Sequence, residues 1–501
     1  MKYGWAEEKF IFPKPISLKG QFAERISQYE EKPLTTTALA VDSGEDQMVL
    51  CSVDIVLVSY FLTAEVRKRL ATCTTGLDPM KVVISAIHTH TGPGYTNVYA
   101  RKSDEEFDKL KLGVGLKDLL PPGKKYVESA NISENENIMQ DDEVFEEVAS
   151  KITKAIKNAW ESRTEGGSFS NAFGRAVVGL CRRACYNDGS AQMWGDTNTA
   201  MFTELEAGSD SGIELMYVFD NNKKLTGIVA NLACPAQCVQ HRLFISPDFW
   251  GEAKMLLRKH FGEDIFLLPL CSAAGDQCPV DLVRWTEPES DVNDPNITRK
   301  NPLVRKADPS MFDLAGMKKT GRRIANEIIE VFSDGLDEPQ VDVPLIHHVH
   351  NMKLPLRKAT MTEIQNAEKE IRDYFLQKEG DADYNDAGNL TGPIGILNRA
   401  KLQEIRDVVE TEVHIIRLGS IAFATNPFEL FLDYGNQIKA RSKAEQSFLV
   451  QLSNGTEGYL PTKKAEQGGH YSAFIASGSV GHVGGEQLVR ETLQDINELF
   501  K

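Results

Sequence analysis

Short apolar runs alternate along the chain with longer segments of helical period. The apolar runs are rich in Val, Ile and Leu and end at turn residues, as buried strands do; they cover residues 48–53, 81–87, 227–233, 265–270, 413–418 and 421–424. Between them, apolar residues recur at helical spacing over 62–73, 142–161, 249–261, 313–334, 362–378 and 485–499. This alternation predicts an α/β fold with a mixed β-sheet core flanked by helices.

Nothing in the sequence divides the chain into parts. It has no internal repeat of fixed period and no Pro- or Gly-rich linker, so one catalytic-type domain over 1–501 is the simplest organisation. Two long stretches, 101–140 and 284–309, show neither the strand pattern nor the helix pattern. Because long loops in compact domains are commonly functional, we expect them to form rims or lids over a pocket; plain surface insertions are the alternative.

Charge and apolar length exclude several functions. The chain has 56 Lys and Arg against 72 Asp and Glu, a formal charge of −16, which argues against binding to nucleic acid or to an anionic membrane. Its most apolar stretches are shorter than the roughly 18 to 20 residues that cross a bilayer. Glu7 and Glu8 interrupt the place where a secretory signal has its apolar core. We expect a cytoplasmic protein with no membrane span and a small-molecule substrate.

The sharpest motif directly follows the strand predicted at 81–87 and reads HTHTGPG over 88–94. Residues two apart on an extended chain project to the same face, so His88 and His90 can converge on one ion or one substrate. Imidazole is the commonest transition-metal ligand, but histidines also pack in cores when they are hydrogen-bonded. The pair is therefore either a metal site or a structural feature.

Other reactive side chains follow the later strands. Cys234, His241 and Asp248 come after the strand at 227–233 and are either metal ligands and acid–base groups or buried thiols, a surface histidine and a helix N-cap. Asp276 and Cys278 come after the strand at 265–270, where α/β sheets usually carry function. Cys278 is a candidate nucleophile, although no flanking basic residue lowers its pKa, which favours an inert thiol.

Three more residues complete the candidate set. Glu429 follows the strand at 421–424, and a helix starting at Pro427 would let it close a capping box; it is equally a candidate metal ligand or proton acceptor. Tyr459 lies in a glycine-flanked loop, where tyrosines normally pack with an exposed hydroxyl. Arg182 is a candidate for holding a carboxylate or an oxyanion, or else part of a solvated turn.

In their order and residue types these segments resemble the neutral, non-lysosomal ceramidase family, specifically its amino-terminal catalytic region. The resemblance spans most of the chain and rests on GWA at 4–6, DSG at 42–44, SVD at 52–54, AIHTHTGPG at 86–94, GDQCP at 275–279, NPFE at 426–429 and SNG at 453–455 with Tyr459. It implies the ceramidase catalytic fold without a carboxyl-terminal immunoglobulin-like domain. It also implies a zinc-dependent hydrolase of amide bonds with one zinc ion per chain.

The resemblance further implies the roles of individual residues. His88 and Glu429 would ligate zinc, Tyr459 would be a ligand or an oxyanion partner, and His90 would lie beside the metal. The cation would lower the pKa of its bound water to around 7 and polarise the scissile carbonyl. The predicted catalytic residues are therefore His90, Asp276, Cys278, Arg182 and Tyr459, and the predicted metal ligands are His88, Cys234, His241, Glu429 and Tyr459.

The chain departs from the family at two positions. Cys234-Pro235 stands where the family has a zinc-ligating histidine followed by proline, and Cys278 stands where it has a serine. A thiolate also ligates zinc, at about 2.3 Å, so either Cys234 or His241 replaces the missing histidine. The sequence thus predicts a zinc-dependent hydrolase of an amide or ester bond in a small polar N-acyl or O-acyl substrate. The alternatives are a ligand-binding or regulatory protein that has lost the catalyst, and a metal-free hydrolase with Cys278 as nucleophile.

Overall fold

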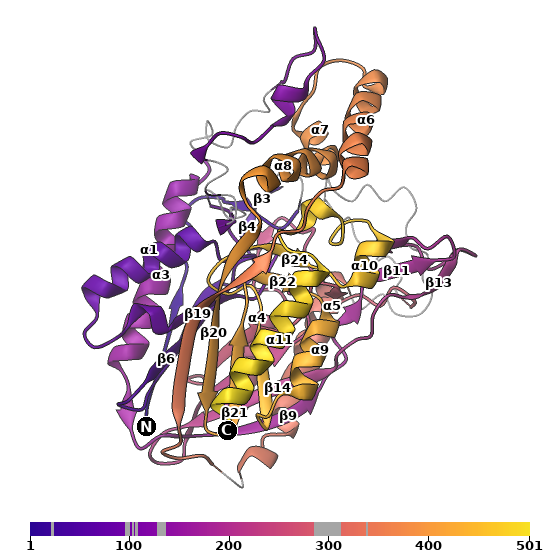
Figure 1. Ribbon diagram of the computed structural model, residues 1–501. Helices are drawn as coiled ribbons and strands as arrows, with labels where there is room; N and C mark the ends of the chain where they lie inside the picture. The colour runs from indigo at the N-terminus through magenta and orange to yellow at the C-terminus, as the bar shows by residue number, and fades with distance from the viewer. Residues whose placement is uncertain are drawn as a thin grey trace.

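A computed structural model describes residues 1–21, 25–95, 101–102, 105, 109–127, 137–284, 312–336 and 339–501. Within these ranges, three sheets of four or five strands form the body of the molecule, and helices cover them from outside (Figure 1). The predicted α/β architecture of mixed sheets with flanking helices is confirmed.

The first sheet has the strand order β7-β6-β5-β1-β8. Its strands are β1 (Lys2–Lys9), β5 (Thr35–Asp42), β6 (Gln47–Val53), β7 (Val82–Ala86) and β8 (Thr164–Glu165). Helices α1 (Tyr60–Cys73) and α3 (Asp141–Glu161) pack on its outer face through a core that includes Val49, Val66 and Ile152.

The second sheet has the order β17-β15-β14-β9 and is backed by helices α4 and α5. Its elements are β9 (Ser168–Arg175), β14 (Gly212–Phe219), β15 (Leu225–Leu232), α4 (Phe249–Phe261), β17 (Phe266–Cys271) and α5 (Asp313–Glu330). Asp248 Oδ1 accepts a hydrogen bond from the Phe249 amide at 2.6 Å, so the predicted N-cap of α4 is confirmed.

The third sheet has the order β19-β20-β21-β23 and is backed by α9 and α11. Its elements are β19 (Leu345–Pro355), β20 (Val408–Leu418), β21 (Ile421–Thr425), α9 (Leu432–Arg441), β23 (Gln446–Val450) and α11 (His482–Leu499). The inner faces of all three sheets share one apolar core, to which Leu50, Leu268 and Phe423 each contribute from a different sheet. Strands that are buried on both faces carry continuous apolar runs, which is why the sequence pattern located β20 and β21 of this sheet.

Each of the three sheets contains one parallel pair: β6 with β7, β15 with β17, and β21 with β23. Backbone hydrogen bonds join the carboxyl ends of these pairs between sheets. The Ala86 amide donates to the Leu452 carbonyl at 3.3 Å, and the Gln451 amide donates to the Cys271 carbonyl at 3.0 Å. The loops that follow β7, β17 and β23 therefore meet at one end of the molecule.

A small helical group lies at the upper end in Figure 1 and consists of α6 (Met361–Gln377), α7 (Tyr384–Asn389) and α8 (Thr391–Ile405). From the long stretch 101–140, Leu116 and Tyr126 pack against Ile371 and Phe375 of this group, and Arg101 donates to the Ala476 carbonyl at 3.2 Å. The second long stretch, apart from its first residue, lies outside the described residues. That these stretches cover a pocket stays a prediction.

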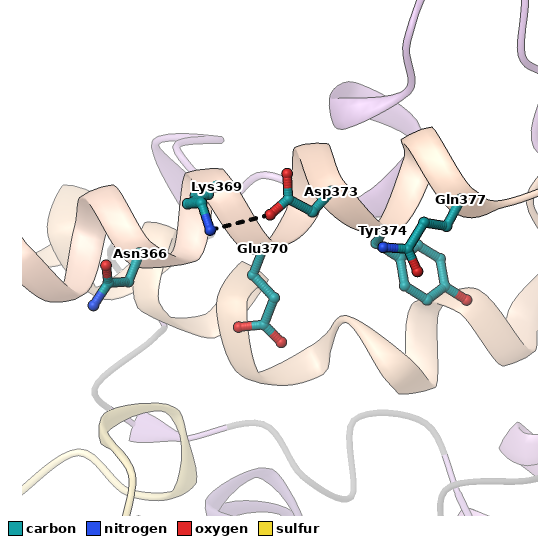
Figure 2. A pocket seen from close by; sticks show the side chains of 6 residues that line it. All are labelled: Asn366, Lys369, Glu370, Asp373, Tyr374 and Gln377. Atoms are coloured by element: carbon teal, nitrogen blue, oxygen red, sulfur yellow. Dashed lines mark ion pairs between the residues drawn. The ribbon is translucent and has the colours of Figure 1, made fainter.

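One face of α6 carries a hollow of about 420 Å³. Figure 2 shows the side chains along it, with an ion pair of 3.3 Å between Lys369 and Asp373. The lining residues are Asn366, Lys369, Glu370, Asp373, Tyr374 and Gln377. None of them belongs to a candidate motif. No helix in the described ranges is long and apolar enough to cross a membrane.

A buried chain of hydrogen bonds ties the loop after β23 to the first sheet. Asn454 Nδ2 lies 2.8 Å from His414 Nε2, and His414 Nδ1 lies 2.8 Å from His347 Nε2. His347 Nδ1 in turn lies 3.0 Å from the Gln47 carbonyl oxygen. Burial lowers the pKa of His347 well below its usual value and also lowers the pKa of His414. Both imidazoles are therefore neutral at pH 7, although the Glu412 carboxylate, 3.0 Å from His414 Nε2, opposes the shift of the His414 pKa.

This pair predicts how stability depends on pH. Because the folded-state pKa values lie below the unfolded value of about 6.5, the folded protein binds fewer protons than the unfolded chain. Its stability is fully present above about pH 6.5 and decreases as the pH falls below that value. We expect the melting temperature to fall between about pH 7.5 and about pH 5.5, and to fall less in His347→Gln. The same fall in that variant and in the exposed-site control His348→Gln would contradict the assignment.

Candidate active site

The loop after β7 brings both histidines of the HTH motif into one site. His88 has φ of 66°, a left-handed conformation that residues other than glycine rarely adopt and that is typical of functional sites. The two Nε2 atoms lie 3.3 Å apart, so the predicted convergence of His88 and His90 is confirmed. The local geometry differs from the prediction, because a turn brings the rings together where the sequence pattern indicated an extended strand.

A second contact sets the orientation of His88. Its Nδ1 lies 2.8 Å from the Val56 carbonyl oxygen, which can only accept a proton. Its Nε2 lies 3.5 Å from Glu429 Oε2. Burial lowers the pKa of His88, although the Glu429 carboxylate opposes that shift. The neutral ring therefore holds its proton on Nδ1 and presents the Nε2 lone pair to Glu429.

Glu429 and Tyr459 are placed side by side by two short parallel strands, β22 (Phe428–Leu430) and β24 (Gly458–Leu460), in which they are register partners. Burial and the neighbouring Glu429 carboxylate raise the pKa of the Tyr459 hydroxyl well above its usual value. The helix proposed to begin at Pro427 does not form there. Because Glu429 lies in β22 and α9 begins only at Leu432, the capping-box interpretation of Glu429 is wrong.

Arg182 is fully buried beside these groups, so the interpretation as a solvated turn is wrong. It follows β10 (Leu180–Cys181), which pairs with β18 (Gln277–Cys278). Its Nη2 lies 2.8 Å from the Gly275 carbonyl oxygen and 3.3 Å from Tyr459 Oη. A buried guanidinium next to a phenol is suited to stabilise an oxygen that gains negative charge.

Two side chains at the site were not among the predicted site residues. Gln237 connects Arg182 to His90, with Nη1 of Arg182 3.2 Å from Gln237 Oε1 and Gln237 Nε2 2.9 Å from His90 Nε2. Tyr471 stands edge-on to Tyr459, with ring centroids 5.5 Å apart, and is hydrogen-bonded to it. Both lie in segments that carry candidate residues, but no local pattern distinguishes them from packing residues.

Arg183, the neighbour of Arg182, holds the loop that carries Tyr471. It is fully buried and pairs with Glu206 at 2.6 Å. It also donates to the carbonyls of Tyr471 at 3.0 Å and Gly469 at 2.7 Å. A planar guanidinium with several fixed donors suits such a multiple contact. The two consecutive arginines thus have different tasks, one at the site and one behind it.

Cys234 and His241 make their contacts elsewhere. The Cys234 thiol is hydrogen-bonded to the Val178 carbonyl at 3.4 Å, and burial raises its pKa well above the usual value. His241 Nε2 lies 3.3 Å from Asp313 Oδ1, and the ring lies against Phe312 with centroids 4.8 Å apart. Within the described part of the chain, no hydrogen bond or ion pair joins either residue to His88 or Glu429. Their roles as metal ligands stay predictions.

Asp276 and Cys278 have structural contacts. Asp276 Oδ1 accepts a hydrogen bond from the Leu432 amide at 3.0 Å, at the first residue of α9, and burial raises the pKa of this carboxyl to about 6. The Cys278 thiol is hydrogen-bonded to the Val280 carbonyl at 3.4 Å, and burial raises its pKa to about 12. Since the thiolate is the nucleophilic form, this environment disfavours the hypothesis of a Cys278 nucleophile.

A zinc ion requires several nitrogen, oxygen or sulfur donors at a fixed spacing. Among the described residues, no three His, Cys, Asp or Glu side chains form a ready-made metal site; the available set is His88, Glu429 and the Tyr459 phenol. Bonds of about 2.0 to 2.2 Å in a tetrahedral centre place ligand atoms about 3.3 to 3.5 Å apart, and His88 Nε2 lies 3.5 Å from Glu429 Oε2. Three protein ligands with one open position are the usual set of a catalytic zinc, and the spacing of His88 and Glu429 fits two of them.

Comparison with solved structures shows similarity along the whole chain. Neutral ceramidase from Pseudomonas aeruginosa aligns with a TM-score of 0.66 and 14% identity over 99% of this chain and 74% of that chain. A ceramidase complexed with C2 aligns with a TM-score of 0.66 and 13% identity over 100% of this chain and 75% of that chain. No family model and no curated protein matches the sequence. The chain therefore has the fold of the neutral ceramidases, as the order of its motifs predicted.

Proposed function

We propose that this protein is a zinc-dependent hydrolase that cleaves an amide or ester bond in a small N-acyl or O-acyl substrate. The observation that carries the proposal is the buried cluster of His88, Glu429 and Tyr459, in which Nε2 of a neutral imidazole lies 3.5 Å from a carboxylate oxygen. The ceramidase fold supports the same class of reaction.

The residues of the chain have distinct tasks in this proposal. His88, Glu429 and Tyr459 would hold the zinc ion, which supplies an activated water and polarises the scissile carbonyl. His90, whose Nε2 lies 3.3 Å from that of His88, accepts the proton of the attacking water and returns it to the leaving group. Arg182 donates to the oxygen that gains negative charge in the transition state. Burial of these groups strengthens each of these electrostatic interactions, because little water screens them.

The metal content of the purified protein tests the zinc assignment. Protein purified without chelator or affinity nickel should hold about one zinc ion per chain, and His88→Ala and Glu429→Gln should each lose it because each removes one of three ligands. Mass spectrometry of the metal against protein concentration measures the ratio. His348→Ala and Glu410→Gln, at exposed positions of β19 and β20, are the matched controls and should keep the ion. Absence of metal in all five proteins after zinc is added back would refute the zinc assignment.

Zinc retention together with a loss of kcat distinguishes the role of Arg182 from that of the metal ligands. Arg182→Met should retain zinc but lower kcat toward p-nitrophenyl acetate and N-acetyl-p-nitroaniline by about 10²- to 10³-fold, the usual cost of removing one oxyanion donor. Circular dichroism checks folding, because the guanidinium also binds the Gly275 carbonyl. Arg490→Met, at an exposed position of α11, should hydrolyse both probes like the unchanged protein. An Arg182→Met enzyme with full kcat would exclude a role for Arg182 in the transition state.

A second candidate is a ligand-binding or regulatory protein that kept this fold without the catalyst. It is favoured by Cys234, whose thiol is hydrogen-bonded to the Val178 and Pro235 carbonyls, at 3.4 and 3.6 Å. Cys234→His discriminates between the two candidates. Hydrolysis that is absent before the change and present after it would support the decayed-site candidate, whereas hydrolysis already present in the unchanged protein supports the enzyme.

A further inference from the structure

We propose that Gln237 is a positioning residue that fixes His90 as the tautomer with its proton on Nδ1 and an unprotonated Nε2. The catalytic meaning of this assignment rests on the proposed hydrolase function. The assignment of the proton itself rests only on hydrogen-bond geometry.

The orientation of the Gln237 amide follows from Arg182. A guanidinium has five N–H donors and no acceptor, so the amide atom 3.2 Å from Arg182 Nη1 must be the Gln237 oxygen. A second hydrogen bond, from Arg182 to the Gly275 carbonyl at 2.8 Å, holds the guanidinium in this position. The remaining amide atom, 2.9 Å from His90 Nε2, is therefore the NH₂ group.

The tautomer of His90 follows from the Gln237 amide. An amide NH₂ group donates and cannot accept, so His90 Nε2 accepts and the proton of the neutral ring lies on Nδ1. Within the described residues, His90 Nδ1 has no hydrogen-bond partner, so no contact there favours the opposite tautomer. The competing contact of His90 Nε2, with the lone pair of His88 Nε2 at 3.3 Å, is longer than its 2.9 Å contact with the Gln237 amide.

Burial makes the arrangement effective. Gln237 is 1% exposed, Arg182 is 2% exposed and His90 is 8% exposed, so bulk water has little access to replace either hydrogen bond. The imidazole also packs closely on Gly20, whose φ is +106° and where a Cβ atom would lie 2.3 Å from His90 Cγ. A side chain at position 20 would displace the ring. Hydrogen bonding and packing thus restrict the same imidazole.

The consequence concerns the direction of proton transfer. The Nε2 atoms of His88 and His90 face each other at 3.3 Å, and the Val56 carbonyl leaves a lone pair on His88 Nε2 as well. The His88 Nε2 lone pair and the Glu429 carboxylate thus border one small volume, which suits a cation, while the His90 Nε2 lone pair accepts from Gln237. Because its Nε2 carries no proton, His90 can accept one there once the hydrogen bond from Gln237 opens. The opposite tautomer would begin as a donor.

The tautomer can be measured directly, by ¹⁵N NMR on protein with labelled histidine, prepared with a chelator so that no metal contributes. His90→Gln identifies the resonances. We expect a protonated Nδ1 and an unprotonated Nε2 in the unchanged protein. Gln237→Glu should reverse the tautomer, because a carboxylate accepts from Nε2–H, and Gln237→Met should give a mixture. Gln487→Glu, on α11, is the matched control and should leave the resonances of His90 unchanged.

A proton on Nε2 in the unchanged protein, or an unchanged tautomer in a folded Gln237→Glu, would overturn the inference. The first of these outcomes is measured on the unchanged protein, so it does not depend on whether a variant folds. Kinetics on zinc-loaded protein give a second readout: Gln237→Met should keep its zinc content and its KM for p-nitrophenyl acetate while kcat falls about 10- to 100-fold, less than the loss of a whole acid–base group.

The two proposals fail in distinguishable ways. If the protein binds no zinc and hydrolyses neither probe, the proposed function is wrong. The tautomer of His90 is still decided by the NMR measurement, which uses metal-free protein. If zinc and hydrolysis are present but Nε2 is protonated, only the role of Gln237 is wrong.

Discussion

The junction of three sheets at the carboxyl ends of their parallel strands is the constraint on which the site depends. Backbone hydrogen bonds from Gln451 to Cys271 and from Ala86 to Leu452 fix the ends of β23, β17 and β7 relative to one another. Backbone amides and carbonyls buried at such a junction must find partners, so the sheets have little freedom to shift. The segments after β7 and β23, which lead to His88 and to Tyr459, start from this fixed end.

Within that frame, the buried guanidinium of Arg182 organises the polar groups. It binds the Gly275 carbonyl, the Gln237 amide and the Tyr459 hydroxyl, which belong to three separate segments of the chain. A buried charge is costly unless its donors are satisfied, and these contacts satisfy most of them. The same contacts orient the side chains that the proposed reaction needs. Stability and site geometry therefore depend on one residue.

The close approach of backbones explains two glycines at the site. A Cβ atom at Gly275 would lie 2.3 Å from the Glu429 carbonyl oxygen, and one at Gly478 would overlap the Tyr459 carbonyl oxygen, at 1.9 Å. Only glycine lets the neighbouring segments lie this close to β22 and β24. By contrast, Cys234 and His241 make contacts of their own, with the Val178 carbonyl and with Asp313.

The sequence by itself determined the positions of β6, β7, β15, β17, β20 and β21 and of the helices α1, α3, α4, α5, α6 and α11, because buried strands and amphipathic helices leave a local pattern. The order of the motifs also determined the fold. Tertiary structure alone decided which reactive side chains meet, because Glu429 joins Tyr459 only through the pairing of β22 with β24. It also decided that Asp276 binds the start of α9 and that Gln237 reaches His90. Such contacts join segments far apart in the chain, and no local pattern of residues encodes them.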